Sequence, residues 1–299
     1  MSWRVILWFA AALLLVLLAG SAAVLAGSVR SWVRVGERSV GRACAILLSA
    51  SLLAGSLYGF WFLSPVVWGR RAVPGDRAMA ESLGKGITFG KQSVLVVVAH
   101  PDDAEWYAGG SLILASRAGS NVTLVVATDG ERGRGGYAST LGLTRRGEQI
   151  EGARLMGCSG VVFLGLRDRG LRGEPELKAK IARVFEEVRP DIVVTFDAEN
   201  PARPYVHPDH QAVGWAVLDI VRQGFDKPVI LYLFSTAKPN AAVDITSAAD
   251  AKAAAVSAHA TQFGGSGGRR ALDGNRAWGE SMGWAYAEMF RVLMPKEKQ

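Results

Sequence analysis

Short runs of hydrophobic residues recur along the chain beyond residue 92, and polar or turn-forming residues bound each of them. Four of these runs cover Ser93–Ala99, Val122–Ala127, Gly160–Leu164 and Asp191–Phe196. Continuous hydrophobic runs of this length are typical of strands that are buried on both faces of a sheet. A fifth run, Val229–Phe234, predicts one more strand.

Stretches with a helical pattern separate these predicted strands and cover Gly109–Ala118, Thr144–Met156 and Glu176–Val188. This alternation of strand and helix predicts an α/β fold with a Rossmann-like, mostly parallel sheet and helices on both faces. Ligands bind to such sheets at the carboxyl ends of the strands, so the residues that follow each strand are the first candidates for chemistry. The glycine-rich stretch at 264–268 predicts a mobile loop.

Two longer hydrophobic stretches, Val5–Val29 and Ala43–Gly69, precede this pattern and contain no charged residue. Each exceeds the roughly 20 residues that a helix needs to cross about 30 Å of hydrocarbon. Tryptophans lie towards their ends, where the membrane interface favours them. We therefore expect a two-helix transmembrane hairpin in residues 1–71, with spans of about 5–29 and 43–69. A polar linker at 72–91 and a domain at 92–299 follow in this prediction.

Each hydrophobic stretch has an alternative interpretation. Arg4 followed by an apolar run also fits a cleaved signal peptide. The run is longer than the roughly 7–15-residue core of such a peptide, which favours a retained span. The second stretch contains Pro65 and several Ser and Gly residues, so a buried helix is its alternative.

The excess of positive charge lies almost entirely in the amino-terminal part of the chain. Residues 1–71 contain seven arginines and one glutamate, a net charge of +6, and the remaining residues contain 27 basic and 26 acidic side chains. The later part shows no basic stripe interleaved with aromatic residues, so we expect no nucleic-acid partner. A hydrophobic fraction of 49% with 20% charged residues excludes a disordered chain. Two cysteines exclude a disulfide scaffold and a four-cysteine zinc site.

Histidine and aspartate residues follow two of the predicted strands. The first strand leads into the motif His100-Pro-Asp-Asp-Ala-Glu105, and the fourth leads through a loop into His207-Pro-Asp-His210. One such motif is commonly a structural turn, because proline fixes the backbone and aspartate accepts local hydrogen bonds. Two of them at one edge of a sheet instead predict a metal site, since imidazole nitrogen and carboxylate oxygen are the ligands of catalytic zinc.

With these motifs, the chain from about residue 93 onwards resembles the LmbE-like, or PIG-L-like, family of metal-dependent de-N-acetylases. The family motifs AHPDD and HPDH are both present, and shorter matches follow in the family's order. These shorter matches are Thr128-Asp-Gly-Glu131, the helix with Arg145, Glu148, Ala153 and Gly157, the set Lys252, His259 and Gln262, and Ala285-Tyr-Ala-Glu-Met-Phe290. The resemblance identifies residues 92–299 as an LmbE-like deacetylase domain.

The resemblance also implies roles for five residues. His100, Asp103 and His210 would bind one divalent metal, for which Zn²⁺ is expected, Asp102 would be the general base, and His207 would be the acid that stabilises the oxyanion. A metal lowers the pKa of water and polarises the amide carbonyl, and a neighbouring carboxylate can take the water's proton. The opposite assignment, with Asp102 as ligand and Asp103 as base, stays open on the sequence.

Five further residues are candidates for substrate binding. Glu131 and Arg132 lie in a glycine-rich segment after the second strand, Arg203 and Tyr205 precede HPDH, and His259 lies in a matching segment. A solvated loop is the alternative for the first pair, and a histidine that caps a helix is the alternative for His259.

The resemblance implies a zinc-dependent N-deacetylase, a hydrolase that acts on an N-acetylglucosamine-type sugar. The predicted hairpin adds a membrane partner and a lipid-linked amino sugar, or glycolipid, as substrate. The arginines on the two sides of the hairpin nearly balance. Eukaryotic members of the family face the cytosol, so we expect a multi-pass membrane protein with a cytoplasmic catalytic domain.

Two other functions compete with hydrolysis. A catalytically silent sugar-binding or scaffold membrane protein on the same fold would lack one of the metal ligands, and all are present. A nucleotide-binding oxidoreductase would carry G-x-G-x-x-G after the first strand, where this chain has His-Pro-Asp-Asp.

Overall fold

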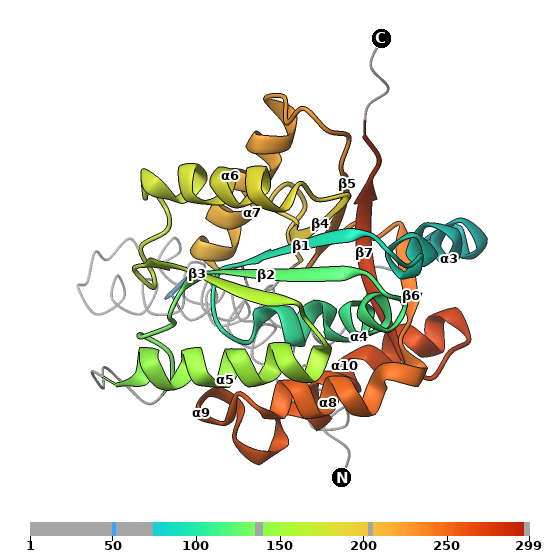
Figure 1. Ribbon diagram of the computed structural model, residues 1–299. Helices are drawn as coiled ribbons and strands as arrows, with labels where there is room; N and C mark the ends of the chain where they lie inside the picture. Colours follow the sequence, from blue (N-terminus) through green and yellow to red (C-terminus); the bar gives the residue numbers. More distant parts are fainter. Residues whose placement is uncertain (1–49, 52–73, 135–139, 203–205, 296–299) are drawn as a thin grey trace, which may run out of the picture. The chain divides into compact units, whose positions relative to one another are not determined.

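The computed structural model describes residues 50–51, 74–134, 140–202 and 206–295 (Figure 1). Apart from Ala50 and Ser51, these residues belong to one compact unit, 72–299. The two predicted membrane spans, 5–29 and 43–69, lie outside the described residues except for Ala50 and Ser51.

The predicted localisation as a multi-pass membrane protein with a cytoplasmic catalytic domain is corrected by the structure. Within the described ranges, no helix is long and apolar enough to cross a membrane. The longest helices there, α5 and α10, have 16 residues each. A helix of that length extends about 24 Å, which is short of the hydrocarbon thickness of about 30 Å.

The described residues form a seven-stranded sheet with the strand order β3-β2-β1-β4-β5-β7-β6. Strands β1 to β5 run parallel, and β7 runs antiparallel to both of its neighbours. The mostly parallel sheet and all five predicted strands are thus confirmed. The strand bounds are β1 Ser93–Val98, β2 Asn121–Thr128, β3 Gly160–Leu166, β4 Ile192–Phe196, β5 Ile230–Phe234, β6 Ala241–Asp244 and β7 Ala287–Leu293.

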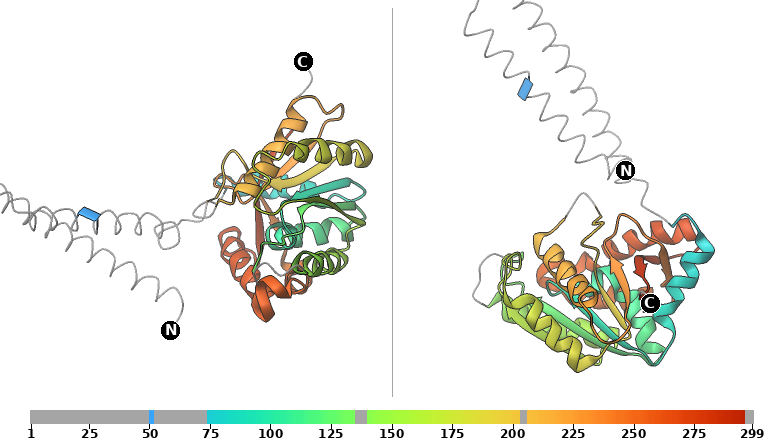
Figure 2. Two further views of the ribbon diagram at one scale, coloured as in Figure 1. Left: turned by 90° about the vertical axis from the view of Figure 1, so that its left-hand side faces the viewer. Right: turned by 90° about the horizontal axis from the view of Figure 1, so that it is seen from above.

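Helices cover both faces of this sheet, as the sequence predicts. Figures 1 and 2 show α6 and α7 on one face and α4, α5, α8 and α10 on the other. The helix bounds are α4 Asp103–Arg117, α5 Leu141–Met156, α6 Glu176–Val188, α7 Pro208–Arg222, α8 Ala249–Ser257, α9 Ala260–Phe263 and α10 Gly267–Met282. On α6, the buried side chains Leu177, Ile181, Val184 and Phe185 follow the spacing of one helical face.

Helix α4 begins six residues before the predicted stretch, which starts at Gly109. Two adjacent glycines, Gly109 and Gly110, favour a boundary in the sequence, but they lie inside the helix. A Cβ atom on Gly110 would lie 2.7 Å from the side chain of Ile245. The glycine therefore permits close packing of α4 against the segment that follows β6.

Two segments expected to be irregular contain helices. Within residues 72–91, α3 (Arg77–Lys85) is followed by the short helix η1 (Gly86–Thr88). Helix α3 buries Ala80 and Gly84 and packs against β6, where a Cβ on Gly84 would lie 1.9 Å from the carbonyl oxygen of Ala242. In the glycine-rich stretch, the short helix η3 (Gly264–Ser266) leads directly into α10.

The order of the strands brings the two histidine motifs together. From β1 the chain proceeds to β2 and β3 on one side and then returns to β4 on the other side of β1. In the register, Val94 of β1 pairs with Ile192 of β4. The loops after β1 and β4 therefore leave the same edge of the sheet in opposite directions, which is where parallel sheets open a crevice for ligands.

Candidate active site

A tight turn between β1 and α4 carries the first motif. The backbone N–H of His100 donates to Oδ2 of Asp103, the first residue of α4, at 2.8 Å. Asp102 precedes the helix with φ 107° and ψ −24°. A residue with a side chain pays about 1–3 kcal/mol for such a conformation, which persists only where the surroundings enforce it.

The three predicted metal ligands lie together. Oδ2 of Asp103 is 3.4 Å from Nδ1 of His100, and Oδ1 of Asp103 is 3.2 Å from Nε2 of His210. The ring of His210, on α7, stacks on Phe196 at the end of β4 with 3.9 Å between centroids. Among the described residues, donor atoms that all lie within 4.8 Å of one another form two groups, His100 with His207 and His210, and His100 with Asp168 and Asp209.

The second ring nitrogen of His100 faces two carboxylates. Its Nε2 lies 3.3 Å from Asp168 and 3.3 Å from Asp209. Asp209 in turn accepts hydrogen bonds from the backbone N–H groups of Arg169 at 2.7 Å and Leu171 at 3.1 Å. A histidine that binds a metal usually donates its other ring N–H to a carboxylate, which fixes the ring. The imidazole nitrogens and carboxylate oxygens gathered around His100 therefore fit a divalent metal.

The charges in this cluster depend on one another. Burial opposes the protonation of His100, but hydrogen bonds to Asp103, Asp168 and Asp209 outweigh it and raise the pKa of the ring well above its usual value. Burial likewise opposes the ionisation of Asp103, and the rings of His210 and His100 outweigh it and lower the pKa of that carboxyl. The carboxylate of Asp103 therefore lies between the imidazole rings of His100 and His210.

Asp102 has different surroundings from Asp103. Two residues one turn apart on α5 hold it: Nη2 of Arg145 donates to its Oδ2 at 3.0 Å, and its own N–H donates to Oε1 of Gln149 at 3.0 Å. Burial and the neighbouring charge of Asp103 raise the pKa of Asp102 to about 7, against the opposing effect of Arg145. A carboxyl with a pKa in this range can both take and return a proton near neutral pH.

His207 caps the amino end of α7. Its Nδ1 accepts a hydrogen bond from the N–H of Asp209 at 3.2 Å, so the neutral ring carries its proton on Nε2. Burial and the positive charges of His100 and His210 lower the pKa of His207 to about 4. The ring is therefore neutral near pH 7 in these surroundings.

A cavity of about 280 Å³ opens onto these side chains. One part of its wall is aromatic: Trp106 and Phe263 stack with 5.0 Å between centroids and 21° between planes. Arginines form another part, and no described carboxylate forms an ion pair with Arg132 or Arg169. The cavity residues are His100, Asp102, Asp103, Trp106, Tyr107, Arg132, Gly133, Arg145, Asp168, Arg169, His207, His210 and Phe263.

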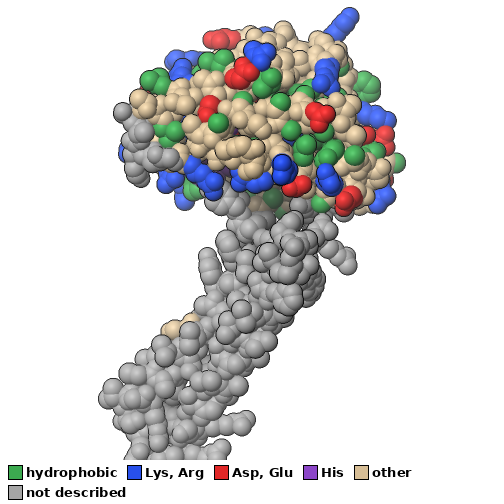
Figure 3. Space-filling view, turned by 90° about the horizontal axis from the view of Figure 1, so that it is seen from below, with side chains coloured by type: hydrophobic (Ala, Val, Ile, Leu, Met, Phe, Trp, Pro, Cys, Tyr) green, Lys and Arg blue, Asp and Glu red, His purple; other side chains and the backbone are tan. Residues whose placement is uncertain are grey.

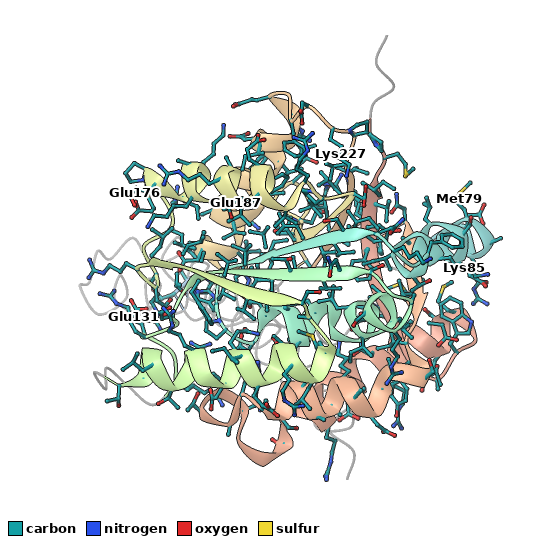
Figure 4. All side chains as sticks on the ribbon, in the orientation of Figure 1. Met79, Lys85, Glu131, Glu176, Glu187 and Lys227 are labelled. Carbon is teal, nitrogen blue, oxygen red and sulfur yellow. The ribbon has the colours of Figure 1, made fainter. Side chains whose placement is uncertain are left out.

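The five predicted substrate-binding residues differ in their positions. Arg132 lines the cavity. Glu131 does not, because its Oε1 accepts the backbone N–H of Asp168 at 2.9 Å and so supports the loop after β3. Figure 4 shows Glu131 at the side of the sheet opposite to α3. His259 is fully buried beside Glu105, outside the cavity lining. Arg203 and Tyr205 lie outside the described residues.

Several cavity residues were not found from the sequence. Asp168 follows β3 at the same edge as the two motifs, so the rule of inspecting each strand end points to it. Of the two residues on α5 that hold Asp102, Arg145 belongs to one of the family matches in the sequence, whereas Gln149, which lies behind the cavity lining, carries no such local signal. Trp106 and Phe263 come from separate elements, and only the fold brings their rings together.

Charged residues elsewhere on the described surface are mixed. On the face shown in Figure 3, Lys and Arg side chains are interspersed with Asp and Glu. This mixture agrees with the near balance of charges beyond position 71.

Comparisons with known proteins agree on one family. The model of the GlcNAc-PI de-N-acetylase (PIG-L) family matches residues 95–221. A probable N-acetyl-alpha-D-glucosaminyl L-malate deacetylase 2 of Bacillus subtilis is 32% identical over 192 residues, which are 58% of this chain and 85% of the relative. A diacetylchitobiose deacetylase of Thermococcus kodakarensis is 30% identical over 191 residues, 58% of this chain and 70% of the relative.

A solved structure is also similar. The N,N'-diacetylchitobiose deacetylase from Pyrococcus horikoshii, in complex with an inhibitor, superposes with a TM-score of 0.62 and 26% identity. The match covers 75% of this chain and 95% of that one.

Proposed function

The chain belongs to the PIG-L family, and from this we propose that it is a zinc-dependent hydrolase that removes the N-acetyl group from an N-acetylglucosamine-type sugar. We assign this activity to the domain at 92–299. The observation that carries the proposal is the opening of one cavity onto Asp102 and onto the cluster of His100, Asp103 and His210. The names of the relatives, which are deacetylases of amino sugars, support the substrate class.

In this proposal His100, Asp103 and His210 hold the metal. Nε2 of His100 faces Asp168 and Asp209, which leaves Nδ1, the nitrogen nearer Asp103, as its ligand atom. A Zn²⁺ ion bound there would lower the pKa of water and polarise the amide carbonyl. Two imidazoles and one carboxylate leave a coordination position open, as catalytic zinc sites do.

Asp102 is the general base. Both oxygens of Asp103 face ring nitrogens, whereas Asp102 lines the cavity and is held from behind by Arg145 and Gln149. These contacts favour Asp103 as the ligand over the opposite assignment. Asp102 takes one proton from the attacking water as its oxygen bonds to the acetyl carbon. When the C–N bond breaks, Asp102 returns this proton to the amine. The acetic acid formed then gives its remaining proton to the amine or to solvent, so the products are acetate and the free amino sugar.

His207 stabilises the oxyanion in the proposed reaction. The resemblance implies an acid that stabilises the oxyanion. In the metal-free protein, burial and the charges of the neighbouring rings lower the pKa of His207 to about 4, which favours the neutral ring there. With Nδ1 accepting from the N–H of Asp209, a neutral ring carries its proton on Nε2, the nitrogen that would donate to the carbonyl oxygen. Neutral His207 thus supplies a hydrogen bond, and proton delivery is left to Asp102.

The cavity wall supports a sugar as the substrate. Aromatic rings pack well against the C–H faces of pyranose rings, and Trp106 and Phe263 form such a surface next to the catalytic groups. We propose that the sugar lies against this wall while Arg132 bonds its substituents. A lipid-linked substrate depended on the predicted hairpin alone and is no part of the proposal.

The test is acetate release from a panel of soluble N-acetylglucosaminides. We expect activity that a chelator abolishes and zinc restores, and a loss of at least about 100-fold in the Asp102→Asn and His100→Ala variants. Asp219→Asn is the matched control, because this carboxylate lies half-exposed on α7 away from the cavity. Full activity in both active-site variants would rule out the mechanism.

A further inference from the structure

One buried face of α5 packs against the start of α4. Arg145, Gln149 and Gly152 follow the spacing of that face. Arg145 and Gln149 contact Asp102 directly, and Gly152 lies against Glu105. The proposed mechanism gives no role to Glu105 or His259, which lie behind Gln149.

Behind Asp102 these groups form a buried chain of contacts. Nε2 of Gln149 donates to Oε1 of Glu105 at 2.5 Å, and the other oxygen of Glu105 lies 3.3 Å from Nε2 of His259. The side chains of Glu105 and His259 are both completely buried. Among the described residues, His259 is the one ion-pair partner of Glu105. A buried carboxylate requires such a partner, because an uncompensated charge in the interior is strongly unfavourable.

We propose that Gln149, Glu105 and His259 form a positioning unit that holds the backbone of Asp102 in its left-handed conformation. The proposal rests on the role of Asp102 given above. Oε1 of Glu105 accepts a hydrogen bond from the NH₂ group of Gln149, and this contact fixes the way the amide is turned. The amide oxygen of Gln149 must then face the N–H of Asp102, as it does. Nε2 of His259 lies against the other oxygen of Glu105, so the three buried side chains hold one another and fix where the Asp102 carboxylate points.

A substitution at Gly152 can perturb this unit without altering the lining of the cavity. A Cβ at this position would lie 2.6 Å from Oε1 of Glu105 and 3.0 Å from Nε2 of His259. Gly147, on the same helix, has nothing within 4 Å of its Cβ position. Gly152→Ala should therefore displace the unit, and Gly147→Ala is its matched control.

The first measurement is hydrogen–deuterium exchange of the zinc-loaded full chain over residues 98–106. The Asp102 amide should exchange about tenfold faster in Gln149→Met, because its hydrogen bond is lost. Gly152→Ala should show the same change, and it tests the same unit if Gln149→Met does not fold. Gly147→Ala should match the wild type. Unchanged exchange in both Gln149→Met and Gly152→Ala would overturn the proposal, whatever the activities.

The second measurement is the kinetics of acetate release. Gln149→Glu places two carboxylates together and should lower kcat at least about tenfold with little change in KM. The double variant with Gln149→Glu and Glu105→Gln again contains one carboxylate and one amide, in exchanged places. It should recover most of the kcat of the wild type, whereas a merely structural role of these residues predicts no such recovery. Absence of recovery counts against the unit. If the exchange data follow expectation while the wild type releases no acetate, the positioning unit stands and the deacetylase function fails.

Discussion

Asp197, at the end of β4, accepts two hydrogen bonds from the guanidinium of Arg291 on β7, at 2.7 and 2.8 Å. The carboxylate also accepts from the hydroxyl of Thr236 and from the backbone N–H groups of Glu199 and Asn200. The Asp197 side chain is completely buried. This pair therefore ties the first part of the loop that leads to HPDH to β7, two strands away from β4 in the sheet.

Arg291→Met should destabilise the protein by about 3–5 kcal/mol at pH 7, because it leaves a buried carboxylate without its partner. Burial alone would raise the pKa of Asp197, but the bonds from Arg291 and Thr236 outweigh it and lower the pKa. A lowered pKa gives stability that is complete above the usual carboxyl value of 3.8 and is lost as the pH falls through the folded value.

Denaturant unfolding of both proteins at pH 7 and near pH 3 measures this difference, which should shrink at the lower pH. Arg189→Met removes an exposed pair with Asp226 and should leave the midpoint unchanged. A difference that stays constant with pH would show that Arg291 acts through packing alone.

Asp102→Asn should stabilise the metal-free protein, and more so at pH 8.5 than at pH 5. The raised pKa of about 7 means that the folded state binds the proton more tightly than the unfolded chain. Stability therefore falls as the pH rises from about 4 to 7, and the whole loss is present above pH 7. Asparagine carries no charge and also tolerates positive φ better than most residues. Thermal unfolding of both proteins at the two pH values is the measurement. Equal increases in unfolding temperature at both values would mean that the substitution acts through the backbone conformation and not through the charge of Asp102.

Zinc should raise the unfolding temperature of the wild type, because a ligand of the folded state stabilises it. Asp103→Asn should lose this increase and Asp102→Asn should keep it. The reverse result would show that Asp102 is the ligand and Asp103 the base. Thermal unfolding with and without added zinc separates the two assignments without any measurement of activity.

Trp106→Ala should raise KM for N-acetylglucosaminides about fivefold with little change in kcat, because an aromatic contact contributes about 1 kcal/mol. Steady-state kinetics on one soluble substrate is the measurement. Phe89→Ala removes an exposed aromatic ring outside the cavity and is the control. A fall in kcat at constant KM would instead mean that Trp106 supports the catalytic turn.

Gly84→Ala should destabilise the protein by about 1–3 kcal/mol, because the added methyl group meets the backbone of β6 and neither element can move freely. The unfolding midpoint of this variant, compared with that of Gly147→Ala, is the measurement. An unchanged midpoint would mean that α3 contributes nothing to the packing of the domain.

The buried strands could be predicted from the sequence because both of their faces pack against helices, so their residues are continuously hydrophobic. The hydrophobic pattern does not predict strand β7, because Glu288 and Arg291 interrupt it inside the fold. Their partners come from distant elements: Lys252 and Ser111 bond Glu288, and Asp197 bonds Arg291. A buried charge with its partner far along the chain looks like a surface residue in a hydrophobicity pattern.

The site divides in the same way. His100, Asp103 and His210 could be found because they belong to short motifs at strand ends, and the structure brings them together. Gln149 lies in a helix whose sequence shows only helical spacing, so its contact with Asp102 follows from packing alone. His259 is a candidate from the sequence, but for substrate binding or as a helix cap, and its place beside Glu105 between α8 and α9 follows from the fold.

The pairing of β1 with β4 also sets an order of events. His100 and Asp103 follow the one strand and His210 follows the other, so the three groups meet only after Val94 has found Ile192 across the chain between them. A nascent chain that ends before β4 holds an incomplete set of donors and would bind zinc weakly. Zinc uptake by the proposed ligands would therefore follow the pairing of β1 with β4 during synthesis, while β5, β6 and β7 are still to be added to the sheet.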